Sequence, residues 1–208
     1  MIEFVGRVVM TPATDNWTRT VIIPGGERRQ TGNTARTFTE DILISSEADT
    51  FMRSRNVQFQ AGGLRPVSRF YPFMDGIGGI DVVPKLIEVS MVSGTFAVGE
   101  TVEGFVGSDK LITFRTARPD HKDGTYNDPT VTYNANPYNT SEILSTQYSA
   151  SGTTVNVDTR SLSANAQGTY FGYITSGMTL VGANSGATAT VTDVRLITDT
   201  FGDLIGTF

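Results

Sequence analysis

The only histidine of the chain, His121, is the first residue to consider for catalytic chemistry. It lies in the segment Pro-Asp-His-Lys-Asp-Gly, between Asp120 and Asp123. Because the chain has no cysteine, a nucleophilic triad would have to combine a serine or threonine with this histidine and a carboxylate. No serine stands in a Gly-x-Ser-x-Gly elbow, and the Ser-Gly pairs are typical of hairpin turns. The pattern therefore predicts a surface turn at His121 and a protein that is not an enzyme.

Metal binding has two weak candidates. Calcium prefers oxygen ligands, and four side chains that carry them lie close together in the sequence: Asp120, Asp123, Asn127 and Asp128. Their spacing does not match the Asp-x-Asp-x-Asp-Gly loop, and a zinc site at His121 lacks further histidine or cysteine ligands. Asp199 and Asp203, around Gly202, form the second candidate. We expect all these side chains to hydrogen-bond to their own turns, so we predict no metal and no cofactor.

Paired carboxylates for glycoside hydrolysis are defined by distance in space, which spacing in the sequence does not show. Glu100 and Glu103 are near one another, with Glu88 upstream. Glu100 follows a turn glycine and Glu103 precedes one, which predicts the solvated end of a hairpin. The segment Gly76–Gly79 follows a strand but precedes no helical pattern, so it is not a phosphate-binding loop.

The elements that would position such groups are clearest between Arg53 and Gly76. Residues 57, 59 and 61 are apolar and alternate with two glutamines, as in a half-buried strand. Gly62-Gly63 then breaks the strand, and an Asp-Gly turn at residues 75–76 ends the aromatic strand that returns.

A corner joins these two strands. Leu64, Pro66 and Phe70 have the spacing of the tyrosine corner of immunoglobulin-like sandwiches, although Phe70 has no hydroxyl group. The hydrogen bond of such a corner must therefore come from another residue. We expect Leu64 and Phe70 to be buried against Phe59 and a strand at Leu86–Val92.

The rest of the chain alternates short apolar runs with turn signals and has almost no period of 3.6 residues. It predicts an all-β fold of β-sandwich or barrel-like modules with long loops, an extended N-terminal arm and very little helix. One short helix is expected at Ser141–Tyr148, capped by Thr140 or Ser141. Two segments, Ser93–Gly104 and Ser176–Gly186, share a Ser-Gly turn and later glycines, and we interpret them as two similar hairpin units.

These signals divide the chain into four parts. We expect an arm at 1–50 that partner chains order, a sandwich-like module at 51–118, a loop rich in Asn, Asp, Tyr and Pro at 119–140, and a second β module at 141–208. The residues expected to contact neighbouring chains are Trp17, Ile22, Ile23, Arg28 and Arg29 in the arm, and Tyr126, Tyr133 and Tyr138 in the loop. The same tyrosines, if exposed, would suit a carbohydrate- or receptor-binding surface instead.

Composition excludes several classes of protein. The net charge is −5, and the arginines are interleaved with acidic residues, which does not favour nucleic-acid binding. No apolar run is long enough to cross a membrane, and the N-terminus does not have the pattern of a signal peptide.

The chain resembles β-rich segments of large structural proteins of contractile-tailed bacteriophages, especially those that infect cyanobacteria. The motifs that carry the resemblance, in order, are RSRNVQFQAGGLRPVSRFYPFMDG, DVVPKLIEV, FAVGETVEG and VGANSGATATVTDVRLITDTFGDLIGTF. They run over most of the chain, from about Asp15 to the end. Family members are usually longer, which implies a compact member or a piece of a longer chain.

This resemblance implies a non-enzymatic virion subunit of the baseplate or tail-fibre attachment apparatus, assembled in the host cytoplasm. Its partners would be other virion proteins, in a homo-trimer or a hetero-assembly. The alternatives are a receptor- or carbohydrate-binding tail-tip module and a head or neck decoration protein.

Overall fold

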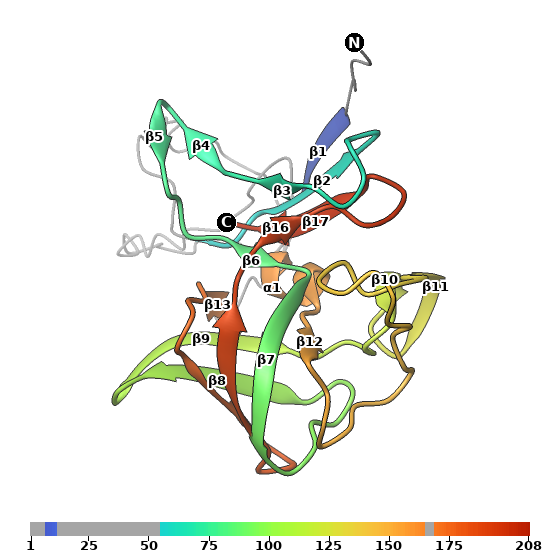
Figure 1. Ribbon diagram of the computed structural model, residues 1–208. Helices are drawn as coiled ribbons and strands as arrows, with labels where there is room; N and C mark the ends of the chain where they lie inside the picture. Colours follow the sequence, from blue (N-terminus) through green and yellow to red (C-terminus); the bar gives the residue numbers. More distant parts are fainter. Residues whose placement is uncertain (1–6, 12–54, 165–168) are drawn as a thin grey trace, which may run out of the picture. The chain divides into compact units, whose positions relative to one another are not determined.

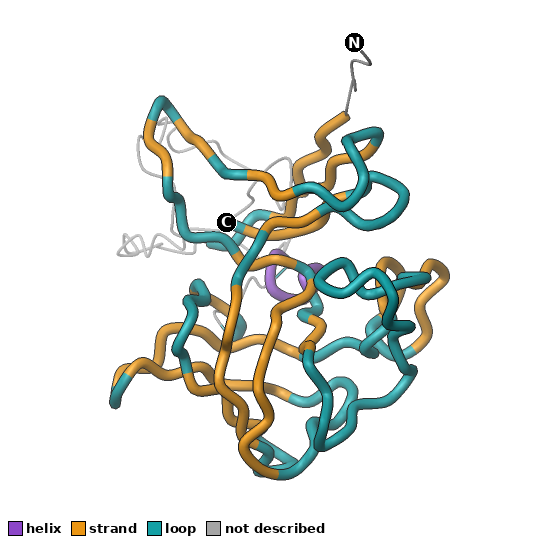
Figure 2. The backbone as a smooth tube through the Cα atoms, in the orientation of Figure 1, coloured by secondary structure: helices purple, strands orange, loops and turns teal. Residues whose placement is uncertain are grey.

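Strands make up nearly all the regular structure of the computed structural model, which describes residues 7–11, 55–164 and 169–208 (Figures 1 and 2). The all-β fold class predicted from the sequence is confirmed. The elements are β1 (Arg7–Thr11), β2 (Gln58–Gly62), β3 (Arg69–Phe70), β4 (Phe73–Met74), β5 (Ile77–Gly78), β6 (Val83–Pro84), β7 (Leu86–Ser93), β8 (Thr101–Val106), β9 (Asp109–Arg115), β10 (His121–Thr125), β11 (Asp128–Thr132), β12 (Thr154–Asn156), α1 (Thr159–Ser163), β13 (Phe171–Gly172), β14 (Thr179–Gly182), β15 (Thr188–Asp193), β16 (Leu196–Ile197) and β17 (Leu204–Thr207). None of the described helices is long and apolar enough to cross a membrane.

The largest sheet is antiparallel and closes on itself. Its strand order is β12-β7-β15-β14-β8-β9-β13, and an antiparallel bridge between Thr116 and Val157 joins the end of β9 to the end of β12. Two further backbone hydrogen bonds complete this seam, from Ala117 to Asn156 and from Asp158 to Arg115, each 2.8 Å long. All strands of the sheet except β13 therefore form a ring, which occupies the lower part of Figure 1.

Side chains fill the inside of the ring, as is usual for small closed sheets. Strand β8 alternates between half-buried and buried residues, and its inward positions are Val102 and Gly104. A Cβ atom at Gly104 would lie 2.5 Å from side-chain atoms of both Ile112 and Met178, so a larger residue would displace these core side chains. The main core comprises Val83, Ile87, Val89, Phe96, Val102, Ile112, Phe114, Val155, Val157, Leu162, Ile174, Met178, Leu180, Ala187, Ala189 and Val191.

The two similar segments found in the sequence are neighbours in this ring. Each begins a hairpin, β8–β9 and β14–β15, as predicted. Strands β8 and β14 also pair with each other, with Leu180 opposite Gly104. The hairpin β14–β15 thereby separates β8 from β7.

A second sheet, in the order β1-β2-β17-β6, covers a smaller apolar cluster. The members of this cluster are Ala61, Leu196 and Leu204, with Phe59, Leu64, Phe70 and Val82 packed against them. The corner residues Leu64 and Phe70 thus lie with Phe59, as expected. Their other neighbours in the cluster include residues of β16 and β17, whereas Ile87 and Val89 of β7 belong to the main core. The expected contact with the strand at Leu86–Val92 is therefore not part of this cluster.

The hydroxyl group that the corner requires comes from Thr198. Its Oγ1 donates a 2.7 Å hydrogen bond to the carbonyl of Arg65 and accepts one of 2.9 Å from the backbone N–H of Ser68. Thr198 is fully buried, so it ties both sides of the corner to the chain beside β16. Pro66 itself is exposed at the turn.

Three expectations need correction. Residues 141–148 form no helix, because the Asn139 carboxamide takes hydrogen bonds from the backbone and hydroxyl of Ser141 and holds a turn instead. The described helix is α1, whose cap is Asp158. The segment 119–140 is not simply a loop, since it contains the hairpin β10–β11. It also does not separate two modules, because the closed sheet combines strands from both sides of it.

Phe70 is half-buried, and this sets the expected effect of removing its ring. Phe70→Ala should lower the free energy of unfolding by about 1–2 kcal/mol, less than for a fully buried phenylalanine. Urea titration of the purified variant measures this value. Ile143→Ala, at a side chain that is 82% exposed, serves as the control and should change stability little. An unchanged stability of Phe70→Ala would contradict the packing described above.

Candidate functional site

His121 is buried, with 1% of its surface exposed, so the prediction of a surface turn residue is wrong. The carboxamide of Asn156, on β12, donates hydrogen bonds to the backbone carbonyls of His121 (2.6 Å) and Pro119 (3.1 Å) and holds this segment inward. The ring Nε2 lies 3.3 Å from the carbonyl of Gly124, and Nδ1 has no hydrogen-bond partner among the described residues. Burial, and secondarily the charge of Lys85, lowers the pKa of His121 to about 4.

Lys85 is the centre of a polar layer where β6 runs into β7. Its backbone N–H donates a hydrogen bond to the carbonyl of Ile205 on β17, and its carbonyl accepts one from the N–H of Val157, just after β12. Its Nζ donates a 2.7 Å hydrogen bond to the carbonyl of Val157. Burial lowers the pKa of this amine to about 7, and the charges of Asp158 and Asp123 oppose that shift only in part. Nearby, the Gln58 carboxamide donates to the Thr159 hydroxyl at 2.8 Å.

An amine that is partly neutral at pH 7 is a potential nucleophile, but Lys85 is only 3% exposed. The cavity that it lines has a volume of about 10 Å³, the size of a single water molecule. No substrate fits beside it, and the arrangement joins the two sheets.

The acidic residues considered for calcium are mostly paired with cations. Arg118 holds Asp120 through two hydrogen bonds of 3.1 and 2.9 Å, and Arg160 pairs with Asp123. Asn127 and Asp128 are exposed. Among the described residues, no three histidine, cysteine or acidic side chains are placed to share a metal ion.

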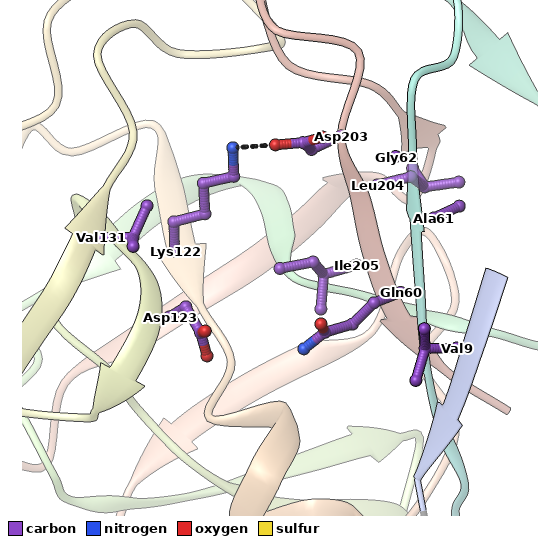
Figure 3. A pocket seen from close by; sticks show the side chains of 10 residues that line it. All are labelled: Val9, Gln60, Ala61, Gly62, Lys122, Asp123, Val131, Asp203, Leu204 and Ile205. Atoms are coloured by element: carbon purple, nitrogen blue, oxygen red, sulfur yellow. Dashed lines mark hydrogen bonds and ion pairs between the residues drawn. The ribbon is translucent and has the colours of Figure 1, made fainter. Parts of the chain in front are cut away.

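The second acidic pair shares one lysine. Lys122 Nζ lies 2.6 Å from a carboxylate oxygen of Asp199 and 2.6 Å from one of Asp203. Figure 3 shows Lys122 and Asp203 meeting at one end of a pocket of about 480 Å³ between β10–β11 and the second sheet. Asp123 and Gln60 also line it. Each charged side chain that lines this pocket has an ion-pair partner, because Lys122 pairs with Asp203 and Asp123 pairs with Arg160.

Glu100 is also buried, at 2% exposure, so it is not the solvated hairpin end that the sequence suggested. Its carboxylate accepts hydrogen bonds from the backbone N–H groups of Ala97 (2.5 Å), Asn184 (3.2 Å) and Ser185 (3.0 Å) and from the Ser185 hydroxyl (2.9 Å). A Cβ atom at Gly182 would lie within 3 Å of this carboxylate. Glu100 therefore links the turns of the two similar segments by hydrogen bonds.

The tyrosines expected at an interface lie largely inside the fold. Tyr133 is buried, and burial raises the pKa of its phenol. The Tyr138 hydroxyl donates a 3.0 Å hydrogen bond to the carbonyl of Leu86, and burial raises its pKa to about 12. Tyr126 is half-buried beneath the guanidinium of Arg115, 4.7 Å from the ring centroid. These three side chains do not form the exposed aromatic surface that a sugar-binding module would use.

Four large apolar side chains are exposed together at or next to the hairpin β4–β5. Tyr71 is 67% exposed, Phe73 71%, Met74 45% and Ile77 70%. This hairpin pairs with no other described strand. Its turn, Asp75-Gly76, has positive φ at both residues, as a two-residue hairpin turn requires, and confirms the predicted turn.

A groove of about 360 Å³ adjoins the hairpin. We use "apolar groove" for the space lined by Phe59, Ala61, Leu64, Phe70, Tyr71, Pro72, Phe73, Met74, Ile80, Val82, Leu196, Leu204 and Phe208. Every one of these residues is apolar or aromatic. Arg69 lies at its edge, with its guanidinium 5.1 Å from the Tyr71 ring centroid. Sequence analysis identified the aromatic strand but treated it as core, because periodicity does not distinguish a side chain facing the core from one facing a partner.

The expected arm contacts at Trp17, Ile22, Ile23, Arg28 and Arg29 lie outside the described residues. Comparisons with protein families, with curated proteins and with solved structures found no match to this chain.

Proposed function

We propose that this chain is a non-enzymatic structural subunit of a bacteriophage virion, a component of the baseplate or of the tail-fibre attachment apparatus. The motifs quoted above support the phage assignment through their resemblance to tail proteins. In this role the closed sheet is a rigid spacer, and neighbouring virion proteins bind to its surface. The work of such a protein is mechanical, and it needs neither a cofactor nor a catalytic residue.

The observation that carries an assembly role is the exposed apolar hairpin β4–β5 beside the apolar groove. Monomeric proteins rarely leave a contiguous apolar surface of this kind open to water, and such surfaces usually mark binding sites for other proteins. A two-stranded hairpin is also marginally stable by itself, which favours a role in which a partner covers it. The buried ionisable groups, by contrast, are occupied in bonds that hold the fold together.

The carbohydrate-binding alternative has less support, because Tyr133 is buried and Tyr138 is half-buried, with its hydroxyl bonded to the carbonyl of Leu86. The head or neck decoration alternative uses the same assembly chemistry and differs only in location. Labelling intact particles with an antibody against this chain would distinguish a tail position from a capsid position.

Incorporation into particles tests the proposal directly. In the virus that encodes the chain, a Phe73→Ser, Ile77→Ser double variant should be lost from purified particles or reduced at least tenfold. The reason is that both side chains are more than two-thirds exposed and support the fold little. A Val92→Ser variant, at a side chain that is 68% exposed on β7, should be incorporated normally. Wild-type amounts of the double variant in infectious particles would refute the assembly role of this surface.

A further inference from the structure

We propose that the partner of the apolar groove is a second copy of this chain, which inserts the tip of its own β4–β5 hairpin. This inference rests on the proposed assembly role and adds the identity of the partner. The tip consists of Asp75, Gly76 and Ile77. Ile77 is 70% exposed and, unlike Phe73 and Met74, does not line the groove of its own chain. Each copy therefore offers one apolar projection and one apolar recess.

The charges next to these two surfaces are complementary. The tip carries the exposed carboxylate of Asp75, immediately before Ile77. The groove has exposed Arg65 and Arg69 beside it, and Arg69 is held at its edge by the Tyr71 ring. When Ile77 enters the groove of a second copy, Asp75 comes near these guanidinium groups. Contact between two tips would instead bring two carboxylates together, which is unfavourable.

The shape of the hairpin also favours insertion. A two-residue turn with positive φ at Asp75 and Gly76 is tight, so the tip is narrow. Because the tip and the groove are different surfaces, closed assemblies arise when two copies exchange tips reciprocally or when further copies complete a ring, whereas a rotation that does not close would give an open filament. We propose a closed assembly. Both closed arrangements bury the groove of every copy.

Sedimentation equilibrium of the full 208-residue chain gives the first test. The wild type should form a discrete oligomer, and Ile77→Ser should weaken self-association at least tenfold without changing the circular dichroism spectrum. Ile143→Ser, at an isoleucine that is 82% exposed elsewhere on the chain, should leave it unchanged. A monomeric wild type at high micromolar concentration, or equal effects of the two serine variants, would overturn the proposal.

A double-mutant cycle of Asp75 and Arg69 tests whether the tip of one copy contacts the groove of another. Asp75→Asn keeps the turn, because Asn-Gly suits it, and should weaken association in the wild-type background. Arg69→Glu should weaken association further, and in that background Asp75→Asn should strengthen it by relieving repulsion. The same sign for Asp75→Asn in both backgrounds would contradict contact between these residues.

These results separate the inference from the proposed function. If the wild type is monomeric but the hairpin variant is absent from particles, the surface binds a different virion protein and the second-copy inference fails. If the chain self-associates through the tip but is absent from particles, the virion assignment fails and the inference stands.

Discussion

Replacing Glu100 with alanine is expected to destabilise the protein by about 3–6 kcal/mol. The substitution leaves the backbone N–H groups of Ala97, Asn184 and Ser185 without their buried acceptor. These hydrogen bonds are part-buried and end on a carboxylate, and the loss of each should cost about 1–2 kcal/mol. Since a domain is typically stable by about 5–15 kcal/mol, this single change should remove a large part of the total. Chemical denaturation at pH 7 measures the loss.

Glu103, on the same strand, provides the matched control. It is partly exposed and pairs with Lys110 at 3.0 Å, an exposed ion pair of the kind that contributes less than about 1 kcal/mol. Glu103→Ala should therefore be nearly neutral. Glu100→Gln keeps one carbonyl acceptor and should fall between the two alanine variants. Similar losses for Glu100→Ala and Glu103→Ala would show that the buried carboxylate does not hold the two turns together.

Local patterns predicted the strands with regular alternation. The half-buried strand expected around residues 57–61 is observed as β2, and the Asp75-Gly76 turn is where its sequence placed it. Strand β17 was not predicted, because Leu-Ile-Gly-Thr is short and contains a glycine. It forms because β2, far upstream in the sequence, supplies a complete register for it. Pairing over such a distance leaves no periodic signal in either segment.

The polar clusters were predicted least well, for a related reason. The segment around His121 is as polar as a surface turn, and only Asn156, 35 residues away, explains its burial. Glu100 likewise has the sequence surroundings of an exposed residue, because its partners in the turn at residues 183–185 are far away in the sequence. The turn residues were predicted correctly, but the expected aromatic strand is divided into β3 and β4, which pair with β16 and β5. Local patterns also do not show which polar groups find buried partners.

Stability is expected to rise with pH between about 4 and 10, with Lys85 making the largest contribution. Because burial lowers the pKa of Lys85 to about 7 from 10.5, the unfolded chain binds more protons than the folded chain between these values. Between pH 7 and about 10.5, the titration of Lys85 should raise the free energy of unfolding by about 3–5 kcal/mol. His121, with its pKa lowered to about 4 from 6.5, should contribute a further loss as pH falls through that range. Above pH 10 the trend should reverse, because folded Tyr138 retains its proton up to about pH 12.

Lys85→Met isolates the lysine contribution. Methionine has a similar length and no charge to desolvate, so at pH 6 the variant should be more stable than the wild type by about 2–4 kcal/mol. At pH 10 the advantage should vanish or change sign, because the wild-type amine is then neutral in the folded protein, where it retains its hydrogen bond to the Val157 carbonyl. Urea titrations of both proteins at pH 6, 8 and 10 measure the difference. Parallel pH profiles would mean that Lys85 keeps its charge in the folded protein. In that case the polar layer between the two sheets would have to be an ion-paired network with Asp158 and Asp123 instead of a neutral one.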